Sequence, residues 1–186
     1  YPDKRVEVMP TLMIETLTEN IIPKTENKTI IGGNFSRWYG GFQSYMIASE
    51  SNNPIYVQSS HSSRYGEDQI PNLNVLPRMT WIDWMKNLSS FKHAIHMMPT
   101  VAAGTFSLNC SYFGIPCIGN IDVDTQRICF PELSFRAENV NEARLAFKKL
   151  NDDENFYTKC KEYSIMKYKE NFSVENFVKK LSNILV

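Results

Sequence analysis

Residues that could contact a phosphorylated ligand gather in two short stretches of the sequence. The first is "GGNFSRWYGG" at residues 32–41, which follows an apolar run. Its glycines let backbone N–H groups approach a ligand closely, and the Arg37 guanidinium could pair with two phosphate oxygens. Gly33, Asn34 and Arg37 are therefore candidate phosphate contacts. The stretch is neither a P-loop nor a regular Gly-x-Gly-x-x-Gly, so a simple glycine turn is an equal alternative.

The second stretch is "PTVAAGTFS" at residues 99–107, with a glycine and two hydroxyls at the predicted start of a helix. The free N–H groups in the first turn of a helix attract anions. Gly104, Thr105, Phe106 and Ser107 are therefore candidate phosphate contacts. Thr105 is also a suitable N-cap residue, and a capping role without any ligand is the alternative.

A third stretch, "NIDVDTQR" at residues 120–127, contains two acids and a glutamine after another apolar run. Such side chains suit the hydroxyl groups of a sugar, so Asp124 and Gln126 are candidate sugar contacts. No third ligand accompanies the two acids, and we expect no metal and no other cofactor. A solvated loop in which Asp124 caps a helix is the alternative.

The elements that would position these stretches alternate along the chain. Apolar and β-branched runs between turns predict strands, and amphipathic stretches predict helices. The predicted strands are 6–10, 28–34, 53–60, 73–77, 92–99 and 115–120, and the predicted helices are 42–50, 81–90, 106–114, 139–152, 153–172 and 173–186, with short pieces at 124–130 and 133–137. We therefore predict an α/β fold, a Rossmann-like three-layer α/β/α arrangement. It would have a mainly parallel sheet of five to six strands and C-terminal helices.

In such a sheet, ligands bind at the carboxyl ends of the strands, where all three candidate stretches lie. The polar loop at residues 59–63 follows another strand and could cover the same site, although a plain surface loop is the simpler interpretation. His93 and His96 alternate with apolar residues, and we assign both to packing. Trp81 and Trp84, three residues apart on one predicted helix, are assigned to the core.

Composition excludes several classes of protein. The 186 residues include 20 basic and 20 acidic side chains, so no net charge attracts nucleic acid or an anionic membrane. There is no apolar run of membrane-spanning length and no secretory signal. The 4 cysteines lack a CxxC spacing, which favours reduced, buried thiols over disulfides or zinc. We expect a cytoplasmic protein, and leave open a peripheral attachment of the full-length protein to a membrane.

Taken together, the motifs resemble the donor-binding, C-terminal domain of GT-B glycosyltransferases. The segments that carry the resemblance are "VEVMPTLMIETLTENIIP", "IIGGNFSRWYGGFQSYMIAS", "NLNVLPRMTWIDWMKNL", "HMMPTVAAGTFSLNCSYFGIPCIGN" and "NFSVENFVKKL". Each motif is degenerate by itself. Their order and spacing along nearly the whole chain make the similarity specific.

The resemblance implies an interdomain linker at residues 1–27 and a Rossmann-like donor-binding domain at residues 28–186. It implies glycosyl transfer from a nucleotide sugar to an acceptor that is a glycan, a lipid or a protein. The acceptor would be held by an N-terminal domain that this chain lacks, and no nucleic-acid partner is expected.

The resemblance also gives roles to the candidate residues. The helix start at 104–107 and Arg37 would bind the donor diphosphate. Arg78 and Met79, between a strand and a helix, would face the nucleotide base. Asp124 and Gln126 would contact the donor sugar.

The sequence departs from the family pattern in ways that leave the function open. Val101 and Asn109 stand where many retaining members have two glutamates, and Tyr39 lies near the place of the usual phosphate-binding lysine. Of the acid–glutamine pair that holds the sugar in some inverting members, only Gln126 matches. Two alternatives follow. One is a catalytically degenerate binding or assembly module, and the other is an enzyme resembling nucleotide-sugar epimerases, which share the architecture.

Overall fold

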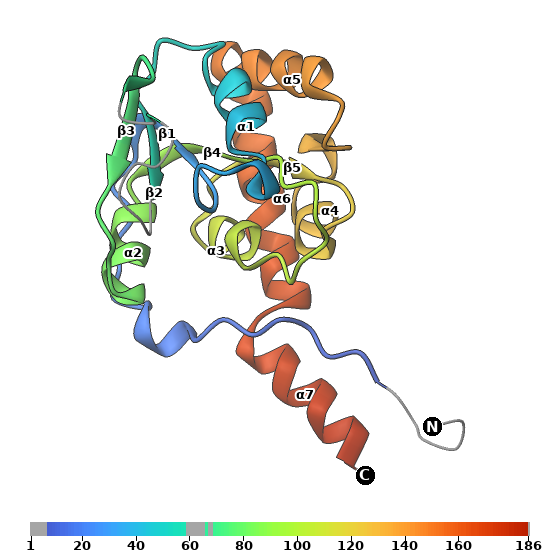
Figure 1. Cartoon of the computed structure of the whole chain (residues 1–186). Coiled ribbons are helices and arrows are strands. Elements are labelled where there is room, and N and C mark those ends of the chain that lie inside the picture. Colours follow the sequence, from blue (N-terminus) through green and yellow to red (C-terminus); the bar gives the residue numbers. More distant parts are fainter. Residues whose placement is uncertain (1–6, 59–65, 67–68, 186) are drawn as a thin grey trace.

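A six-stranded, all-parallel sheet forms the centre of the computed structural model, which describes residues 7–58, 66 and 69–185 (Figure 1). The strands are β1 (Glu26–Ile31), β2 (Ile55–Gln58), β3 (Leu73–Leu76), β4 (Phe91–His96), β5 (Cys117–Asn120) and β6 (Ser134–Phe135). Their order across the sheet is β3-β2-β1-β4-β5-β6, and every neighbouring pair is parallel. The predicted parallel α/β fold is confirmed. The polar loop predicted at 59–63 lies outside the described residues.

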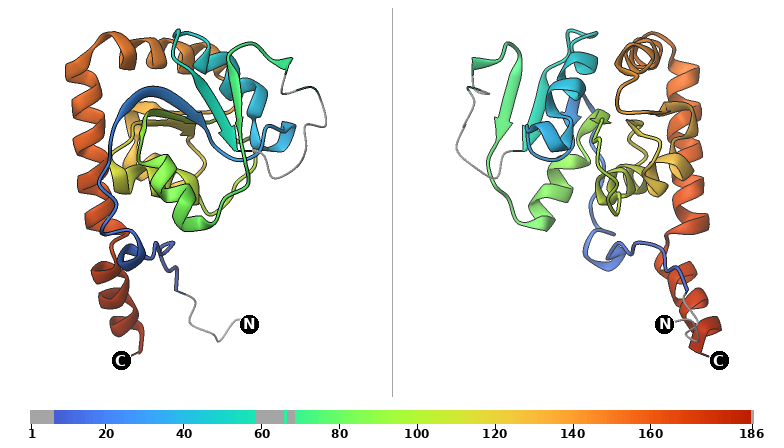
Figure 2. Two further views of the ribbon diagram at one scale, coloured as in Figure 1. Left: turned by 90° about the vertical axis from the view of Figure 1, so that its left-hand side faces the viewer. Right: turned by 45° about the vertical axis from the view of Figure 1, so that its right-hand side comes forward.

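Helices cover both faces of this sheet. They are α1 (Gly41–Ala48), α2 (Trp81–Leu88), α3 (Thr105–Phe113), α4 (Asp124–Cys129), α5 (Val140–Asp152), α6 (Glu154–Asn171) and α7 (Val174–Leu185), with short 3₁₀ turns η1 (Glu15–Leu17), η2 (Arg37–Tyr39) and η4 (Pro131–Leu133). The connection from β1 to β2 crosses the sheet in one direction. The connections from β3 to β4, from β4 to β5 and from β5 to β6 cross it in the other direction. Right-handed crossovers therefore place α1 on one face and α2, α3 and α4 on the other, as the predicted three-layer arrangement requires. Helix α5 packs on α1, and α6 runs along one side to contact α3 and α4 (Figure 2).

The core consists of the continuous apolar runs that the sequence predicts for buried parallel strands. Ile30 and Ile31 of β1 and Ile95 of β4 have no exposed surface. Burying a side chain of this size contributes about 1.5–3 kcal/mol to stability. The 4 cysteines are also buried and form no disulfide, as predicted.

His93 belongs to the same core, which confirms its assignment to packing. It has no exposed surface, and its ring packs edge-on against Phe147 and Tyr157. Burial, with a smaller contribution from the charge of Lys92, lowers the His93 pKa to about 3, so the imidazole is neutral at physiological pH.

The ends of the helices show which local signals the sequence carries. Asp83 N–H donates to Thr80 Oγ1 at 3.2 Å, so the predicted cap of α2 is confirmed. Gly114 ends α3, also as predicted. The core assignment of Trp81 is wrong: it is 38% exposed, because Met85 and Leu88 fill the inward face of α2.

The segment before β1 packs on the domain without forming a strand. The strand predicted at 6–10 is wrong for Glu7–Pro10, which are irregular and pair with no strand of the sheet. Just after them, Thr11 Oγ1 donates to the Ala103 carbonyl. Met13 is buried in the core, and Tyr168 Oη donates to Glu15 Oε1 at 2.7 Å. The division into a linker at 1–27 and a domain at 28–186 stays a prediction. No described helix has the length and apolar character needed to span a membrane.

Candidate functional site

A pocket of about 370 Å³ opens at the carboxyl edge of the sheet, between β1 and β4. Crossovers leave these two strands in opposite directions, so helices on opposite faces diverge and leave a crevice, the usual ligand position in open α/β sheets. The pocket is lined by Gly33, Tyr39, Gln58, Trp84, His96, Met98, Ala102, Ala103, Gly104, Thr105, Phe106, Asn109 and Val123. Its size is within the range of small-molecule sites. We call it the strand-end pocket.

The start of α3 supplies free hydrogen-bond donors to this pocket. Helix geometry leaves the N–H groups of Thr105, Phe106 and Ser107 without partners inside the helix, and the first two residues line the pocket. Gly104, not Thr105, is the N-cap residue, so the predicted cap is wrong. The chain reaches the helix in a left-handed turn, with φ 70° at Gly104, where a side-chain cap does not form.

Gly104 is required here because α4 approaches the turn very closely. A Cβ at this position would lie 2.0 Å from Thr125 Oγ1. The hydroxyls of Thr125 and Ser107 are 2.6 Å apart and lie 2.8 and 3.0 Å from the Gly104 carbonyl. Ser107, predicted as a phosphate contact, is buried and outside the pocket lining. Its hydroxyl instead fixes the loop that carries the free N–H groups.

One wall of the pocket is a cluster of rings. His96 stacks on Tyr39 with centroids 6.3 Å apart and meets Phe106 edge-on at 5.2 Å. Trp84 lies beside Phe106. Burial lowers the His96 pKa to about 4, so the ring is neutral, and its buried Nε2 has no hydrogen-bond partner among the described residues. An aromatic wall with a neutral polar atom suits a planar heterocyclic ligand.

The sequence predicts that His96 and Trp84 pack in the interior, and both do, His96 against Tyr39 and Phe106 and Trp84 against the core. It does not predict that they also line a pocket, and it does not single out Gln58. The positions of His96 and Gln58 at the ends of their strands do give a signal that these residues line the pocket. His96 is the last residue of β4 and Gln58 the last of β2, so both stand at the carboxyl edge where ligands bind. Trp84 gives no local signal, because the three-residue spacing from Trp81 is also that of a core stripe.

Of the other predicted phosphate and base contacts, one lines the pocket and four do not. Gly33, from the glycine stretch, lines the pocket. Arg37 is exposed in η2, and neither Arg37 nor Asn34 lines the pocket. Arg78 and Met79 also lie outside the lining, where Trp84 and Gln58 are found instead. The roles of these four predicted residues stay predictions.

The predicted sugar contacts separate in the structure. Asp124 is the first residue of α4, with Val123 as the cap, and its carboxylate pairs with Arg127 at 2.6 Å. It lines a neighbouring pocket. Gln126 is 2% exposed, and its Nε2 donates to the carbonyls of Cys117 at 2.7 Å and Leu133 at 3.3 Å. The Gln126 carboxamide thus joins β5 to η4 and faces the interior.

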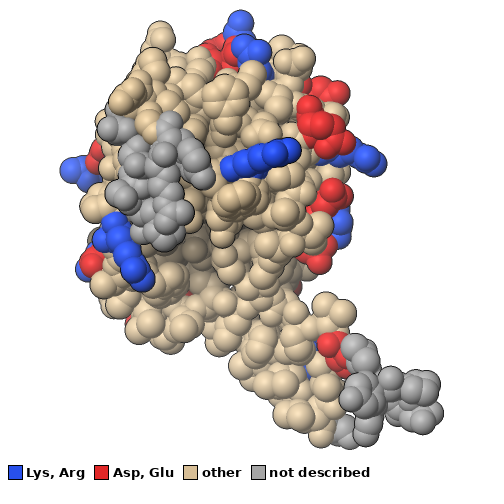
Figure 3. All heavy atoms as spheres, viewed as in Figure 1, with Lys and Arg blue, Asp and Glu red and all other residues tan. Residues whose placement is uncertain are grey.

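The strand-end pocket has few charges. Among the described residues, its lining contains no Lys, Arg, Asp or Glu. The face seen in Figure 1 is mainly uncharged over α1 and α3, and most of its visible acids lie along one margin (Figure 3). Nor do three His, Cys, Asp or Glu side chains of the described residues gather as a metal site would need. An anion in this pocket would therefore be held mainly by backbone N–H groups and ring edges.

Comparison with known proteins gives matches for the structure alone. No family model and no curated protein matches the sequence. The sucrose-phosphate synthase of Thermosynechococcus elongatus superposes with a TM-score of 0.68 and 11% identity, covering 94% of this chain and 48% of that one. A point mutant of S. aureus TarM was solved in complex with fondaparinux, alpha-GlcNAc-glycerol and UDP. It superposes with a TM-score of 0.69 and 11% identity, covering 86% of this chain and 36% of that one. The pneumococcal O-GlcNAc transferase GtfA, solved in complex with UDP and GlcNAc, superposes with a TM-score of 0.66 and 12% identity. The match covers 87% of this chain and 35% of that one.

These matches define the class of fold. The chain has the fold of GT-B glycosyltransferases over part of their length, so the predicted resemblance is confirmed for the fold. It spans about half or less of the solved chains it matches.

Proposed function

We propose that the chain is the donor-binding part of a GT-B-type glycosyltransferase and that the strand-end pocket binds a nucleotide sugar. The observation that carries the proposal is the position of this pocket at the switch point of the sheet, against the free N–H groups of α3. Such N–H groups bind phosphates without a basic side chain. Two proteins of the same fold, TarM and GtfA, were solved in complex with UDP.

Each part of the donor has a proposed partner. Thr105 and Phe106 would donate backbone N–H groups to the diphosphate, with Arg37 supplying charge from η2. These donors would stabilise the negative charge of the leaving diphosphate during transfer. Trp84 and Gln58, on the α2 and β2 side, would hold the base. The sugar would extend toward Ala102 and Ala103, where the pocket borders Asp124.

The same proposal includes a further domain that holds the acceptor and a cytoplasmic location, where nucleotide sugars are available. The activity needs both sides of the cleft. We therefore expect the 186-residue chain to bind the donor and to transfer sugar very slowly by itself.

Calorimetric titration with UDP, GDP, ADP and CMP tests donor binding. One nucleotide is expected to bind selectively, and the fold's stability should increase with the logarithm of its concentration. Replacing Trp84 with Leu should weaken its binding at least 5-fold, because stacking of a base on an aromatic ring is worth about 1–3 kcal/mol. Trp81→Leu, three residues earlier on α2 and outside the pocket, is the control and should change affinity less than 2-fold. Equal affinities in the two variants, or no binding by any nucleotide, would contradict the proposal.

The uncharged lining favours one alternative, a binding or assembly module without catalytic activity. Such a module would not hydrolyse or transfer sugar from any bound nucleotide sugar, even after addition of a separately produced acceptor domain. Release of free sugar or nucleotide from a bound donor would exclude it. Epimerisation of an added nucleotide sugar would instead identify the epimerase-like alternative.

A further inference from the structure

His96 is a buried polar side chain that lacks a partner at the wall of the strand-end pocket. It is the last residue of β4 and lines the pocket. Its Nε2 atom is buried and makes no hydrogen bond to a described residue. A buried polar atom without a partner lowers stability, so such an atom beside a cavity indicates a ligand that completes its interactions.

Three neighbouring residues hold the imidazole in one orientation. Its ring stacks on Tyr39 with centroids 6.3 Å apart and planes 23° apart, and it meets Phe106 edge-on at 5.2 Å. Gly32 leaves room for this arrangement, because a Cβ there would lie 2.8 Å from His96 Cγ and 2.7 Å from Phe106 Cδ1. A ring that stacks on Tyr39 is also suited to carry a charge, since the face of an aromatic ring attracts a cation.

The imidazole lies beside the free N–H groups at the start of α3. Phe106 connects the two features, because its ring contacts His96 and its backbone N–H is among the free donors of the first turn. Thr105 and Phe106 line the same pocket as His96. A phosphate held by these N–H groups would therefore lie close to the imidazole, and a nearby negative charge favours the protonated ring.

Without a ligand, His96 is neutral because its surroundings are buried and uncharged. Burial lowers its pKa to about 4, and no charged group adds to this effect. Tyr39 is the other titratable side chain among the described residues of the lining. At His93, by contrast, the charge of Lys92 contributes to the low pKa. A bound anion would thus be the nearest charge that acts on His96.

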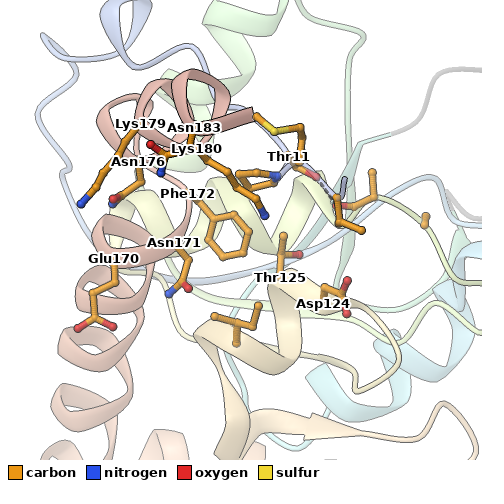
Figure 4. Close-up of a pocket in the computed structure, with 16 residues that line it drawn as sticks. Thr11, Asp124, Thr125, Glu170, Asn171, Phe172, Asn176, Lys179, Lys180 and Asn183 are labelled. Atoms are coloured by element: carbon orange, nitrogen blue, oxygen red, sulfur yellow. Dashed lines mark hydrogen bonds between the residues drawn. The ribbon is translucent and has the colours of Figure 1, made fainter. Parts of the chain in front are cut away.

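Basic side chains near this site lie outside the lining of the strand-end pocket. Arg37 is exposed in η2. A neighbouring pocket of about 550 Å³ shares the loop at 102–103 with the strand-end pocket and contains two lysines (Figure 4). These are Lys179 and Lys180 of α7, and both are exposed to solvent. Among the described residues, His96 is therefore the side chain of the lining that can become a cation beside a bound phosphate.

We propose that His96 takes up a proton from the solvent when a phosphorylated ligand binds in the strand-end pocket, and that the resulting imidazolium pairs with the phosphate. The ligand class is a phosphate ester or a diphosphate. The assignment of this group to the diphosphate of a sugar donor rests on the proposed function. In that case the imidazolium would act with the N–H groups of Thr105 and Phe106 to stabilise the leaving diphosphate. A charge that forms only with the ligand also spares the empty pocket an unpaired buried cation.

The test is NMR of the histidine ring nitrogens in the ¹⁵N-labelled chain at pH 7, with inorganic pyrophosphate as the ligand. The ring nitrogens of neutral and protonated imidazole have distinct ¹⁵N shifts. We expect the His96 signals to change from the neutral to the protonated form, together with shifts of the Thr105 and Phe106 amides. His93 is the internal control, because it packs in the core outside the pocket lining and should stay neutral. Amide shifts at α3 with a neutral His96 would refute the proposal, and so would the absence of pyrophosphate binding.

The variant His96→Gln separates charge from hydrogen bonding, because a carboxamide donates a hydrogen bond but does not protonate. Calorimetry gives the ratio of the pyrophosphate affinities of the original chain and the variant, in which the titration of pyrophosphate itself cancels. The original chain should bind at least 5-fold more tightly at pH 6. This ratio should fall at least 3-fold by pH 8, since one proton changes an affinity by up to about 10-fold per pH unit. A ratio that does not depend on pH would refute proton uptake.

A nucleotide separates this proposal from the proposed function. The NMR experiment is repeated with whichever of UDP, GDP, ADP and CMP binds in calorimetry. Nucleotide binding with a neutral His96 would refute the proposal and leave the proposed function standing. Pyrophosphate binding with a protonated His96, but without binding of any nucleotide, would support the phosphate site and refute the proposed function.

Discussion

Replacing Gly104 with alanine should destabilise the loop that carries the free N–H groups of α3. Two effects add. The left-handed backbone, with φ 70°, costs an L-residue roughly 1–2 kcal/mol. The new Cβ would stand 2.0 Å from Thr125 Oγ1, so Thr125 must move and lose its hydrogen bond to the Gly104 carbonyl, about 1 kcal/mol more. The free energy of unfolding should therefore fall by about 2–3 kcal/mol.

Gly66→Ala is the matched control for backbone strain. Gly66 has φ 76°, but among the described residues a Cβ there would meet only Gln69 Cδ and Oε1, both at 3.9 Å. This variant should lose only the roughly 1–2 kcal/mol of the left-handed backbone. Any change of unfolded-state entropy is the same in both variants and cancels in the comparison.

Urea denaturation, followed by tryptophan fluorescence, measures both variants. The double variant Gly104→Ala/Thr125→Ala removes the clashing hydroxyl. It should be at least about 1 kcal/mol more stable than the sum of the single effects predicts. If Gly104→Ala and Gly66→Ala lose the same stability, or if the double variant is simply additive, close approach of α4 is not the reason for glycine at position 104.

Three further predictions concern titration, packing and binding. The lowered pKa values of His93 and His96 mean that the unfolded chain binds more protons, so the stability from the neutral rings is complete above pH 6.5 and falls as the pH drops toward the folded pKa values of about 3 and 4. Between pH 7 and pH 5, urea denaturation should show that the free energy of unfolding falls by roughly 2 kcal/mol for each of the two histidines. In His93→Phe the contribution of His93 to this fall should be absent. A free energy of unfolding that does not change with pH would show that neither ring is held neutral. Gln126→Ala should lower the free energy of unfolding by about 2–4 kcal/mol in the same assay, because two buried carbonyls lose their donor. The affinity for a nucleotide sugar should not change. Weaker binding with unchanged stability would instead support Gln126 as a sugar contact. Asn109→Leu should weaken binding of the selected nucleotide about 5-fold by calorimetry through one lost hydrogen bond, with the exposed Asn141→Leu as control, and equal affinities would remove Asn109 from the site.

The fold could be predicted well from sequence because its signals are local and periodic. The runs at 28–34 and 92–99 form β1 and β4. The Thr80 hydroxyl caps the start of α2, and Gly114, which lacks a Cβ, ends α3 in a left-handed conformation. These signals depend on neighbouring residues alone. Four of the candidate phosphate contacts, Gly33, Gly104, Thr105 and Phe106, line the strand-end pocket, because the strand-end rule needs only the order of elements. Their role as phosphate contacts stays a prediction.

Where local sequence signals do not predict the position of a side chain, the cause is contact between residues far apart in the chain. Thr105 lost the cap position because Thr125 approaches Gly104, and Gln126 faces inward because two carbonyls at Cys117 and Leu133 take its amide. Nothing near these residues in the sequence records those partners.

The sequence by itself determined the parallel α/β architecture, the buried thiols and the edge of the sheet at which a ligand would bind. Only the tertiary structure decided which side chains line each cavity. It brought His96 beside Tyr39 and Trp84 beside Phe106. Secondary structure follows from local propensity and periodicity, whereas a binding site is a set of distances between distant residues, and only packing fixes those distances.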